Sequence, residues 1–410
     1  MSDRKLPLRT KFATSLTRSA AALSRATGRG DGSVIGGRIG LMVDPQLLAN
    51  LAAGRQIALI SGTNGKTTTT RLTAAALGVL GDVATNSLGA NMPTGHTSAL
   101  ARAGRTPYAV LEVDEHYLAQ VLRATTPQVV ALLNLSRDQL DRAKEVAMMA
   151  ALWRETLADS AVHVVANADD PMVTWAASVA KAVTWVAAGQ RWHDDSWVCP
   201  SCGSHIERSG DEWWCTACDL RRPIAQWAVR DGGVVDPTGE FHEVHLQLPG
   251  RVNRANAATA LAVAAHFGVA VAAALPRLSQ VTSIAGRYAT VVRDGRTIRL
   301  LLAKNPAGWL EAFDMAERAP TLLSINARDP DGLDTSWLYD VDFSPLRGRQ
   351  VLVTGDRAMD LAVRLEVNEI PFAHVSTFGQ AVFAVPAGRL EVIANYTAFQ
   401  DIRAELDRVN

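Results

Sequence analysis

The sequence predicts an α/β protein with two domains built on parallel sheets and a small cysteine-bearing insertion in the first domain. Apolar runs with the length of buried strands alternate with helical stretches along most of the chain, which is the pattern of βα units. Four cysteines and several tryptophans interrupt this alternation, which then resumes. The length of 410 residues also exceeds the roughly 250 to 300 residues that a single core supports.

The composition is that of a folded globular protein. Hydrophobic residues make up 48% of the chain, and 41 Lys and Arg balance 41 Asp and Glu. These values exclude disordered and collagen-like chains. Binding to nucleic acid through bulk charge needs an excess of Lys and Arg, so we expect no nucleic-acid partner.

A basic helical segment is predicted for residues 1–45. Basic residues interleave with Leu and Phe in the first thirty positions, without the apolar run and cleavage site of a secretion signal. We interpret the segment as an amphipathic helix followed by a glycine-rich connection over 28–40. A surface helix packed on the body is favoured, and contact with an anionic membrane surface is the alternative. No run of roughly 18 apolar residues is present, so we expect no segment to span a bilayer.

The strongest functional motif is a glycine loop between the strand IALIS and a helix. Backbone N–H groups of such a loop and the positive end of the helix bind phosphate oxygens. Lys66 would add a charge on the β and γ phosphates of ATP, and Thr67 would offer its hydroxyl to Mg²⁺. Ile60 stands where the full Walker pattern has its first glycine, and a tight turn with a surface lysine is the structural alternative. The residues expected to bind the nucleotide here are Gly62, Thr63, Asn64, Gly65, Lys66, Thr67 and Thr68.

Three acids end the strand-like run at 108–115 and are candidates for binding Mg²⁺. The alternation of a strand cannot bury all three, so at least one should face the nucleotide end of the sheet. Divalent Mg²⁺ takes oxygen ligands, commonly one or two carboxylates together with phosphates. We assign Glu112 to Mg²⁺, whereas a helix-capping role suits Asp114 or Glu115 better.

Three asparagines are further candidates for contact with the nucleotide. Asn167 lies in NADDP after the strand VHVVA, and Asn253 and Asn256 open a helix after LPGRV. An Asn side chain can pair with a base or ribose edge, but it also caps helices and turns. The sequence leaves both roles open.

The cysteines form the pattern Cys-x₂-Cys-x₁₂-Cys-x₂-Cys. In a large chain without a secretion signal this pattern favours metal over disulfides. Each Cys-x₂-Cys pair is expected to form a tight turn, and the two turns together supply four thiolates in a tetrahedron for Zn²⁺. The ion would be structural, because protein ligands fill all four positions. We therefore expect a zinc ribbon inserted over 191–228, with the ligands Cys199, Cys202, Cys215 and Cys218.

The second domain boundary falls near residue 285, where a turn leads into a new strand. We expect a central ATP-binding domain over 46–285 and a smaller Rossmann-like α/β domain over 286–410, a size typical of an independent unit. The strands of the second domain are expected at IRLLLAKNPAG, TLLSINARD, QVLVTG and EVIANY.

The order of the motifs resembles that of the Mur ligases, which are ATP-dependent amide-forming enzymes of peptidoglycan synthesis. The motifs of the central domain are GTNGKTTT, NLSRDQLDR, NADDP and GRVNRANAATALA. Those of the last third are similar to the MurT branch, the synthetase subunit of lipid II isoglutaminyl synthase, as is the four-cysteine insertion. These are LLAKNPAGW, INARDPDGLDTSWLYDVDF, VTGDRAMDLAVRL and IANYTAF.

The resemblance implies a Mur ligase-like fold and a specific activity. The D-glutamate α-carboxylate of the lipid II stem peptide would be amidated to D-isoglutamine through an acyl phosphate made from ATP. Ammonia would come from a GatD-type glutaminase subunit in a heterodimer. By motif position, Asp334 would supply an acid that orients the catalytic His of that partner, whereas the sequence alone favours a capping residue for SWLYD.

Two other functions remain open. A free-standing amino-acid ligase of Mur or folylpolyglutamate type would use an amino acid in place of ammonia. A nucleotide-regulated zinc-ribbon adaptor without catalysis would not need the acids at 112–115. For the favoured enzyme we expect a cytoplasmic protein that acts on lipid II at the membrane surface. Peripheral attachment to the inner face of the membrane is the alternative.

Overall fold

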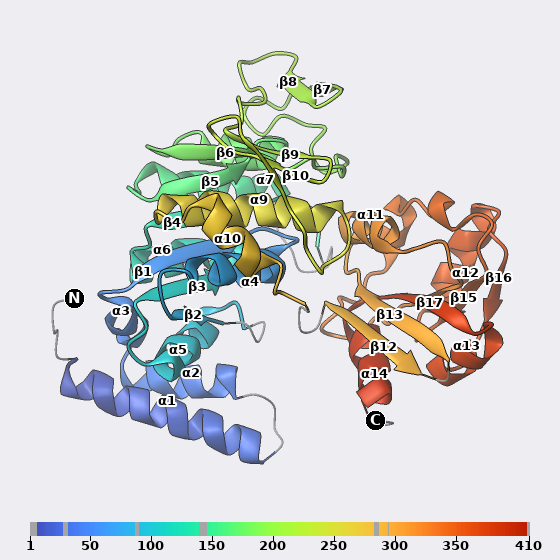
Figure 1. Ribbon diagram of the computed structural model, residues 1–410, viewed down its shortest axis with the longest axis horizontal. Helices are drawn as coiled ribbons and strands as arrows, with labels where there is room; N and C mark the ends of the chain where they lie inside the picture. The colour runs from blue at the N-terminus through green and yellow to red at the C-terminus, as the bar shows by residue number, and fades with distance from the viewer. Residues whose placement is uncertain are drawn as a thin grey trace. The chain divides into compact units, whose positions relative to one another are not determined.

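The computed structural model describes residues 6–27, 32–86, 90–138, 146–282, 287–293 and 295–407 (Figure 1). The chain divides into two compact units, each with a sheet of its own. The larger unit comprises Met1–Leu135, Val146–Leu248 and Val252–Thr282, and the smaller unit comprises Ser136–Glu145, Pro249–Arg251 and Ser283–Asn410.

The sheet of the larger unit has nine strands among the described residues. They are β1 (Gln56–Ser61), β2 (Val83–Thr85), β3 (Tyr108–Glu112), β4 (Val129–Leu132), β5 (His163–Asn167), β6 (Val183–Ala187), β9 (Trp227–Arg230), β10 (Gly233–Val235) and β11 (Phe241–Glu243). Their order is β11-β10-β9-β6-β5-β4-β1-β3-β2. The strands from β9 to β2 run parallel, and β10 and β11 continue the sheet as an antiparallel hairpin. The parallel strands therefore end at one edge of the sheet, where ligands of such folds gather.

Helices of the larger unit flank this sheet (Figure 1). They are α1 (Leu8–Ala26), α2 (Ser33–Val43), α3 (Leu47–Ala52), α4 (Lys66–Leu77), α5 (Pro93–Ala103), η1 (Glu115–Tyr117), α6 (Leu118–Thr125), α7 (Val146–Ala158), α8 (Pro171–Ala177), α9 (Arg251–His266) and α10 (Val271–Leu278). The main core packs apolar side chains of β1, β3, β4 and β5 against these helices, with Trp153 of α7 fully buried among them. Strands buried in this way on a helix-covered sheet are typical of parallel α/β folds.

Part of the glycine-rich stretch after α1 is helical, so its interpretation as a connection over 28–40 is wrong for the part that forms α2. The rest of this stretch, over 28–31, lies outside the described residues. The glycines of α2 lie where it packs between α1 and α5. A Cβ atom on Gly37 would collide with the carbonyl oxygen of Thr94, and one on Gly40 would collide with the hydroxyl of Thr17. The glycines therefore permit close helix packing here, although glycine lowers intrinsic helix propensity.

The cysteine insertion contains a two-stranded antiparallel sheet made of β7 (Ile206–Ser209) and β8 (Glu212–Cys215). Its small core consists of Ile206, Trp213 and the cysteines. The chain enters the insertion after β6 and returns to the main sheet at β9, which pairs with β6 in parallel.

The smaller unit has a sheet of six strands among its described residues. They are β12 (Tyr288–Arg293), β13 (Arg296–Leu302), β14 (Thr321–Ser324), β15 (Val351–Thr354), β16 (Phe372–His374) and β17 (Gly388–Ala394). The order is β12-β13-β17-β14-β15-β16. The five strands from β13 to β16 in this order are parallel, and β12 is antiparallel to β13. The helical segments are α11 (Pro306–Met315), η2 (Ser336–Asp340), η3 (Ser344–Leu346), α12 (Ala358–Val367), α13 (Phe378–Ala384) and α14 (Tyr396–Asp407).

Two separate apolar clusters pack against this second sheet. One contains Trp309 and Phe343, and the other contains Phe378 and Phe399. This arrangement is that of a doubly wound α/β domain. The predicted fold class, with two parallel sheets and a cysteine insertion in the first, is confirmed.

None of the helices in the described ranges is long and apolar enough to cross a bilayer.

A buried ion pair joins two neighbouring strands of the smaller unit, β13 and β17. Arg299 of β13 lies opposite Glu391 of β17 in the register, and its guanidinium donates to both carboxylate oxygens at 2.7 and 2.8 Å. The Glu391 side chain is fully buried, and the guanidinium also donates to the carbonyl of Met315. Removing one partner of such a pair leaves a buried charge without compensation.

We expect Glu391→Ala to lower the free energy of unfolding by about 3 kcal/mol, because the buried Arg299 would lose both of its carboxylate hydrogen bonds and keep only the more exposed Glu317, at 3.6 Å, as a counter-charge. Chemical denaturation of the full chain measures this. The exposed acid Glu366 provides the control, since Glu366→Ala should change stability by less than about 0.5 kcal/mol. Equal stability of the two variants would contradict the importance of the pair.

Candidate functional site

The glycine loop follows β1 directly and leads into α4. Gly62 and Gly65 have φ values of 142° and 85°, in the region that favours glycine. Gly65 is the N-cap of α4, and a Cβ atom there would lie 2.6 Å from Oδ1 of Asn256. Both the backbone conformation and the close approach of α9 therefore require glycine at this position.

Asn134, just beyond β4, holds the loop in place. The backbone N–H of Thr63 donates to the carbonyl oxygen of Asn134 at 2.9 Å, and the N–H of Asn64 donates to its side-chain Oδ1 at 2.9 Å. The side-chain Nδ2 of Asn134 donates in turn to the carbonyl of Asn64 at 3.1 Å. The loop is thus bound by three hydrogen bonds to the end of a neighbouring strand.

The N-terminus of α4 has the features of an anion site. Its first turn contains Lys66, Thr67 and Thr68 and no acidic residue, and its N-cap provides no side-chain cap because it is glycine. The partial positive charge of a helix N-terminus favours phosphate. The loop and the helix start thus form a cradle of the phosphate-binding type.

The ammonium group of Lys66 is buried and lies within this cradle. Nζ donates to the carboxylate of Glu115 at 3.0 Å, to the carbonyl of Thr63 at 3.1 Å and to the carbonyl of Gly62. Glu115 comes from η1, directly after β3, and its role as an ion-pair partner is missed by sequence reasoning. Asp114, its neighbour, caps η1 by accepting from the N–H of His116, as its sequence position suggests.

Glu112 ends β3, opposite Ile60 of β1 in the register. Its backbone is held by Asn86, which both donates to and accepts from it, and its carbonyl is 2.7 Å from Nε2 of His96. Burial lowers the pKa of His96 to about 4, so this imidazole is neutral. The side-chain Oε2 of Glu112 is buried and makes no hydrogen bond within the described part of the chain.

This unsatisfied oxygen fits a metal ligand. A buried carboxylate oxygen without a donor is costly unless a cation or another group compensates it. Glu112 and Thr67 carry side-chain oxygen atoms, which is the ligand type that Mg²⁺ prefers. Both residues lie at the same edge of the sheet, because β1 and β3 are parallel neighbours.

Asn256 and Asn253, near the start of α9, are linked to the loop region. Oδ1 of Asn256 accepts from the hydroxyl of Thr69 in α4 at 3.1 Å, and its Nδ2 donates to Oδ1 of Asn253 at 3.2 Å. The structure thus brings this predicted pair against Gly65 and the first turns of α4.

Asn167 lies at the end of β5, and its amide is engaged within the protein. Its Nδ2 donates to the carbonyl of Leu133 at 2.9 Å and to Oε1 of Gln190 at 2.7 Å, and its Oδ1 accepts from the N–H of Asp169 at 3.0 Å. Both hydrogens of Nδ2 are used in these bonds, so Asn167 could contact a nucleotide without losing a bond only through the second lone pair of Oδ1. The neighbouring Asp170 caps α8 and also accepts from the N–H of Leu135, and burial raises the pKa of its carboxyl.

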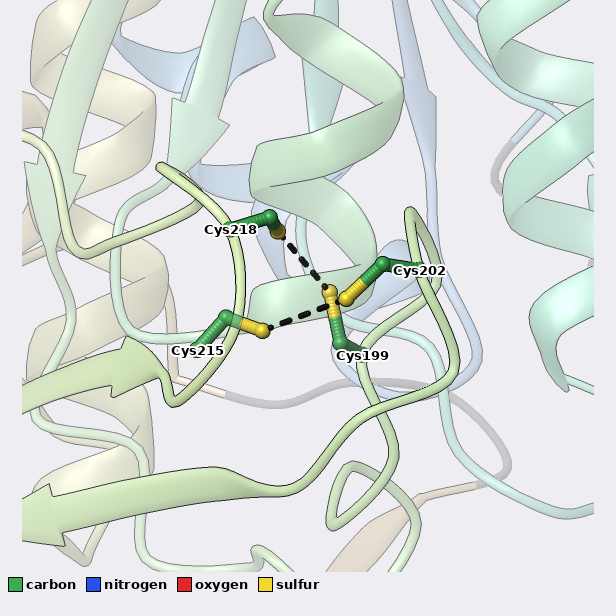
Figure 2. Close-up of side chains that lie close together, drawn as sticks. All are labelled: Cys199, Cys202, Cys215 and Cys218. Atoms are coloured by element: carbon green, nitrogen blue, oxygen red, sulfur yellow. Dashed lines mark hydrogen bonds between the residues drawn. The ribbon is translucent and has the colours of Figure 1, made fainter.

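The four cysteines converge from two turns of the insertion (Figure 2). Sγ of Cys199 is 3.7 Å from that of Cys218, and Sγ of Cys202 is 3.4 Å from that of Cys215. All four sulfur atoms lie within 4.8 Å of one another. A tetrahedron with Zn–S bonds of about 2.3 Å has sulfur atoms about 3.8 Å apart, so the donor set fits a zinc ion.

The insertion is anchored to the loop after β5. Trp213 donates from Nε1 to the carbonyl of Ala168 at 3.0 Å. Arg222 forms an ion pair with Asp169 at 2.8 Å, and Asp169 also accepts from the N–H of Gly189. The motif NADDP therefore has a clear structural role, because it joins the main sheet to the cysteine ribbon.

Asp334 lies in the smaller unit, just before η2, and its side chain is exposed. Its Oδ1 accepts from the N–H of Ser336 at 2.8 Å, which lowers the pKa of the carboxyl and keeps it ionised. Exposed apolar side chains occur at Leu333 and Tyr339 in the same segment and at Met359 and Val363 of α12, which packs against η2.

Comparison with protein families assigns the fold. Residues 60–264 match the model of the Mur ligase middle domain, and residues 302–399 match that of the MurT ligase C-terminal domain. The chain belongs to the Mur ligase family. Its C-terminal third places it in the MurT branch, and it is a ligase.

The sequence similarity to known proteins extends over almost the whole length of this Mur ligase. It is 29% identical to the Staphylococcus aureus (strain COL) protein named lipid II isoglutaminyl synthase (glutamine-hydrolyzing) subunit MurT, over 96% of this chain and 97% of the other. It is 27% identical to the protein of the same name from Streptococcus pneumoniae, over 91% and 92%. A pseudomurein peptide ligase type C from Methanothermus fervidus has the same fold, with a TM-score of 0.70 at 16% identity over 89% and 81% of the two chains.

We expect the purified Mur ligase to contain about one zinc ion per chain and Cys202→Ser to lose it, because a hydroxyl is a poor replacement for a thiolate ligand. Cys202 is exposed, so the change removes a ligand without disturbing the core. Elemental analysis of the metal content measures this. The neighbouring Ser201→Ala should keep the ion, and a wild-type chain without zinc would contradict the assignment.

Proposed function

We propose that this ligase amidates the α-carboxylate of D-glutamate in the stem peptide of lipid II, with ATP as the energy source and ammonia as the nucleophile. The observation that carries the proposal is the combination of a phosphate-binding loop with a MurT-type C-terminal domain in one chain. The relatives that match it over 97% and 92% of their own length are named as subunits of lipid II isoglutaminyl synthase.

The reaction proceeds in two steps. An oxygen of the substrate carboxylate attacks the γ-phosphorus of ATP, the bond to the β-phosphate oxygen breaks, and ADP leaves. Ammonia then attacks the carbonyl carbon of the acyl phosphate, inorganic phosphate leaves, and a proton passes to solvent. The product is the amide.

The residues of the cradle have separate roles in the first step. The start of α4 and the N–H groups around Gly65 hold phosphate oxygens, and Lys66 offsets the charge that develops on the γ-phosphate. Glu112 and Thr67 would hold Mg²⁺, which lowers the repulsion between the substrate carboxylate and the phosphates. Asn256 orients the loop from the side of α9.

A glutaminase partner of GatD type would supply the ammonia. The name of the relatives as subunits supports a complex. Asp334 is exposed and ionised, so it can accept a hydrogen bond from an imidazolium that belongs to another chain. Exposed apolar side chains such as Leu333 and Tyr339 provide contact area of the kind found at protein interfaces.

The cysteine site would hold zinc in a structural role. All four ligand positions are occupied by protein sulfur atoms, so a substrate or water has no position on the ion. The ribbon joins the loop after β5 through Arg222 and Trp213, and zinc would stabilise that edge of the sheet.

We expect Lys66→Ala to lower ATP-dependent amidation of lipid II by at least about a hundredfold, because a charge on the transferred phosphate is lost. The assay uses an ammonium salt as nitrogen source and detects the amide by mass spectrometry. The exposed Lys181→Ala is the control and should keep full activity. Retained activity in Lys66→Ala would contradict the mechanism, and products carrying an added amino acid would favour a free-standing amino-acid ligase.

We expect Asp334→Asn to lower glutamine-driven amidation by at least about a hundredfold and to leave ammonia-driven amidation unchanged, because the acid acts on the partner's histidine. Asp342 is a matched control, since it is exposed and its Oδ1 accepts from the N–H of Ser344 at 2.9 Å in the same way. Asp342→Asn should keep both activities. Equal loss of both activities in Asp334→Asn would contradict the split role.

A further inference from the structure

Helix α1 has two different faces. The face toward the body is made of small and hydroxyl side chains, among them Thr10, Ala13 and Thr17, which are buried. The outward face carries large apolar side chains, with exposed serines between them. Leu8, Phe12 and Leu23 are 84%, 61% and 66% exposed.

The exposed apolar residues form a stripe along the helix. At about 100° per residue, Leu8, Phe12 and Leu23 fall within an arc of about 60° that is opposite the buried face. With a rise of about 1.5 Å per residue, the stripe extends over more than 20 Å. Its members are too far apart to fill one pocket, but they suit a flat apolar layer.

Basic side chains border the stripe. Lys11, Arg18 and Arg25 are exposed and fall on one side of it, and Arg9 falls on the other. Two of these arginines also attach the helix to the body, since Nε of Arg9 donates to the carbonyl of Val43 and Nε of Arg18 donates to that of Ala101. The helix is therefore held firmly while its apolar stripe faces outward.

The neighbouring helix α2 has a similar composition. It exposes Val34, Ile35 and Met42, and its charged residue is Arg38. Neither helix contains an acidic residue. Figure 1 shows α1 on the outer side of α2 and α5, away from the central sheet of this unit.

We propose that the outward face of α1 docks in the plane of an anionic lipid surface, with the stripe among the acyl chains and the basic border at the phosphate headgroups. An interfacial helix of this kind has Leu and Phe on one face and Lys and Arg at its margins. The charge complementarity favours lipid over a protein partner, because every charged residue of α1 and α2 is positive. This docking keeps the ligase peripheral and does not require the proposed reaction.

Co-sedimentation of the full chain with lipid vesicles tests the proposal. The chain should bind vesicles of phosphatidylcholine with phosphatidylglycerol, more weakly at high salt, and should bind far less to phosphatidylcholine alone. The triple variant Leu8→Gln, Phe12→Gln, Leu23→Gln should bind at least about tenfold more weakly, since the apolar contact is lost. The matched control changes three exposed apolar residues elsewhere, Ile224→Gln, Val292→Gln and Phe383→Gln, and should bind as the wild type does.

A single charge can be tested in the same assay. Lys11→Ala should weaken binding by about fivefold, since one Lys near an anionic surface contributes about 1 kcal/mol, whereas Lys181→Ala should have no effect. The proposal is overturned if the wild type does not bind the anionic vesicles, if it binds neutral vesicles as strongly as anionic ones, or if the triple variant binds anionic vesicles as strongly as the wild type. Loss of glutaminase binding in the triple variant with vesicle binding intact would also overturn it, because the stripe would then be a protein interface. The vesicles contain no lipid II, so failure of the amidation proposal leaves these outcomes unchanged.

Discussion

The hydrogen bonds between Asn134 and the glycine loop are the contacts on which the site depends. Asn134 lies just beyond β4, the parallel neighbour of β1, so the two strands deliver the loop and its clamp to the same edge. On the other side, Asn256 of α9 approaches Gly65 so closely that no side chain fits between them. Contacts with a strand end on one side and with a helix on the other therefore fix the loop conformation in the absence of a ligand. Preorganisation of this kind lets backbone N–H groups stabilise phosphate without rearrangement.

The sequence predicts the parts of the site that are contiguous in the chain. The loop, the start of α4 and the cysteine turns are local patterns, and each carries its chemistry within a few residues. Asn134 and Glu115 are not local, because they bond to the loop across 70 and 49 positions of sequence. Identifying them requires the register of β1 with β3 and β4, which periodicity does not provide. The pairing of Glu115 with Lys66 cannot be predicted either, because the sequence does not show which of the three neighbouring acids is buried.

The fold is predicted best where strands are continuous and apolar, as in β1, β4, β14 and β15. It is predicted worst where burial is partial or where glycine has a packing role. Strands β10 and β11 have three residues each, and β11 is largely exposed, so neither has a recognisable pattern. In α2 the glycines indicate a connection by composition, yet they are the residues that let α1 and α5 approach on both sides. Tertiary packing overrides local propensity there, which single-sequence reasoning cannot see.

The two exposed acids Asp334 and Asp342 show why a partner residue is hard to recognise from sequence. Each is followed two positions later by a serine whose N–H it accepts, and each precedes a short 3₁₀ helix. Local geometry therefore gives both the same capping role. The serine side chain also bonds to the carboxylate in both cases. The two acids differ in their neighbours, because the exposed Leu333 lies beside Asp334, whereas Asp342 lies between the buried Val341 and Phe343. A carboxylate can orient a histidine of another chain only where that chain can pack around it, so the exposed apolar neighbour is the feature that favours Asp334 over Asp342 for the proposed role toward a partner.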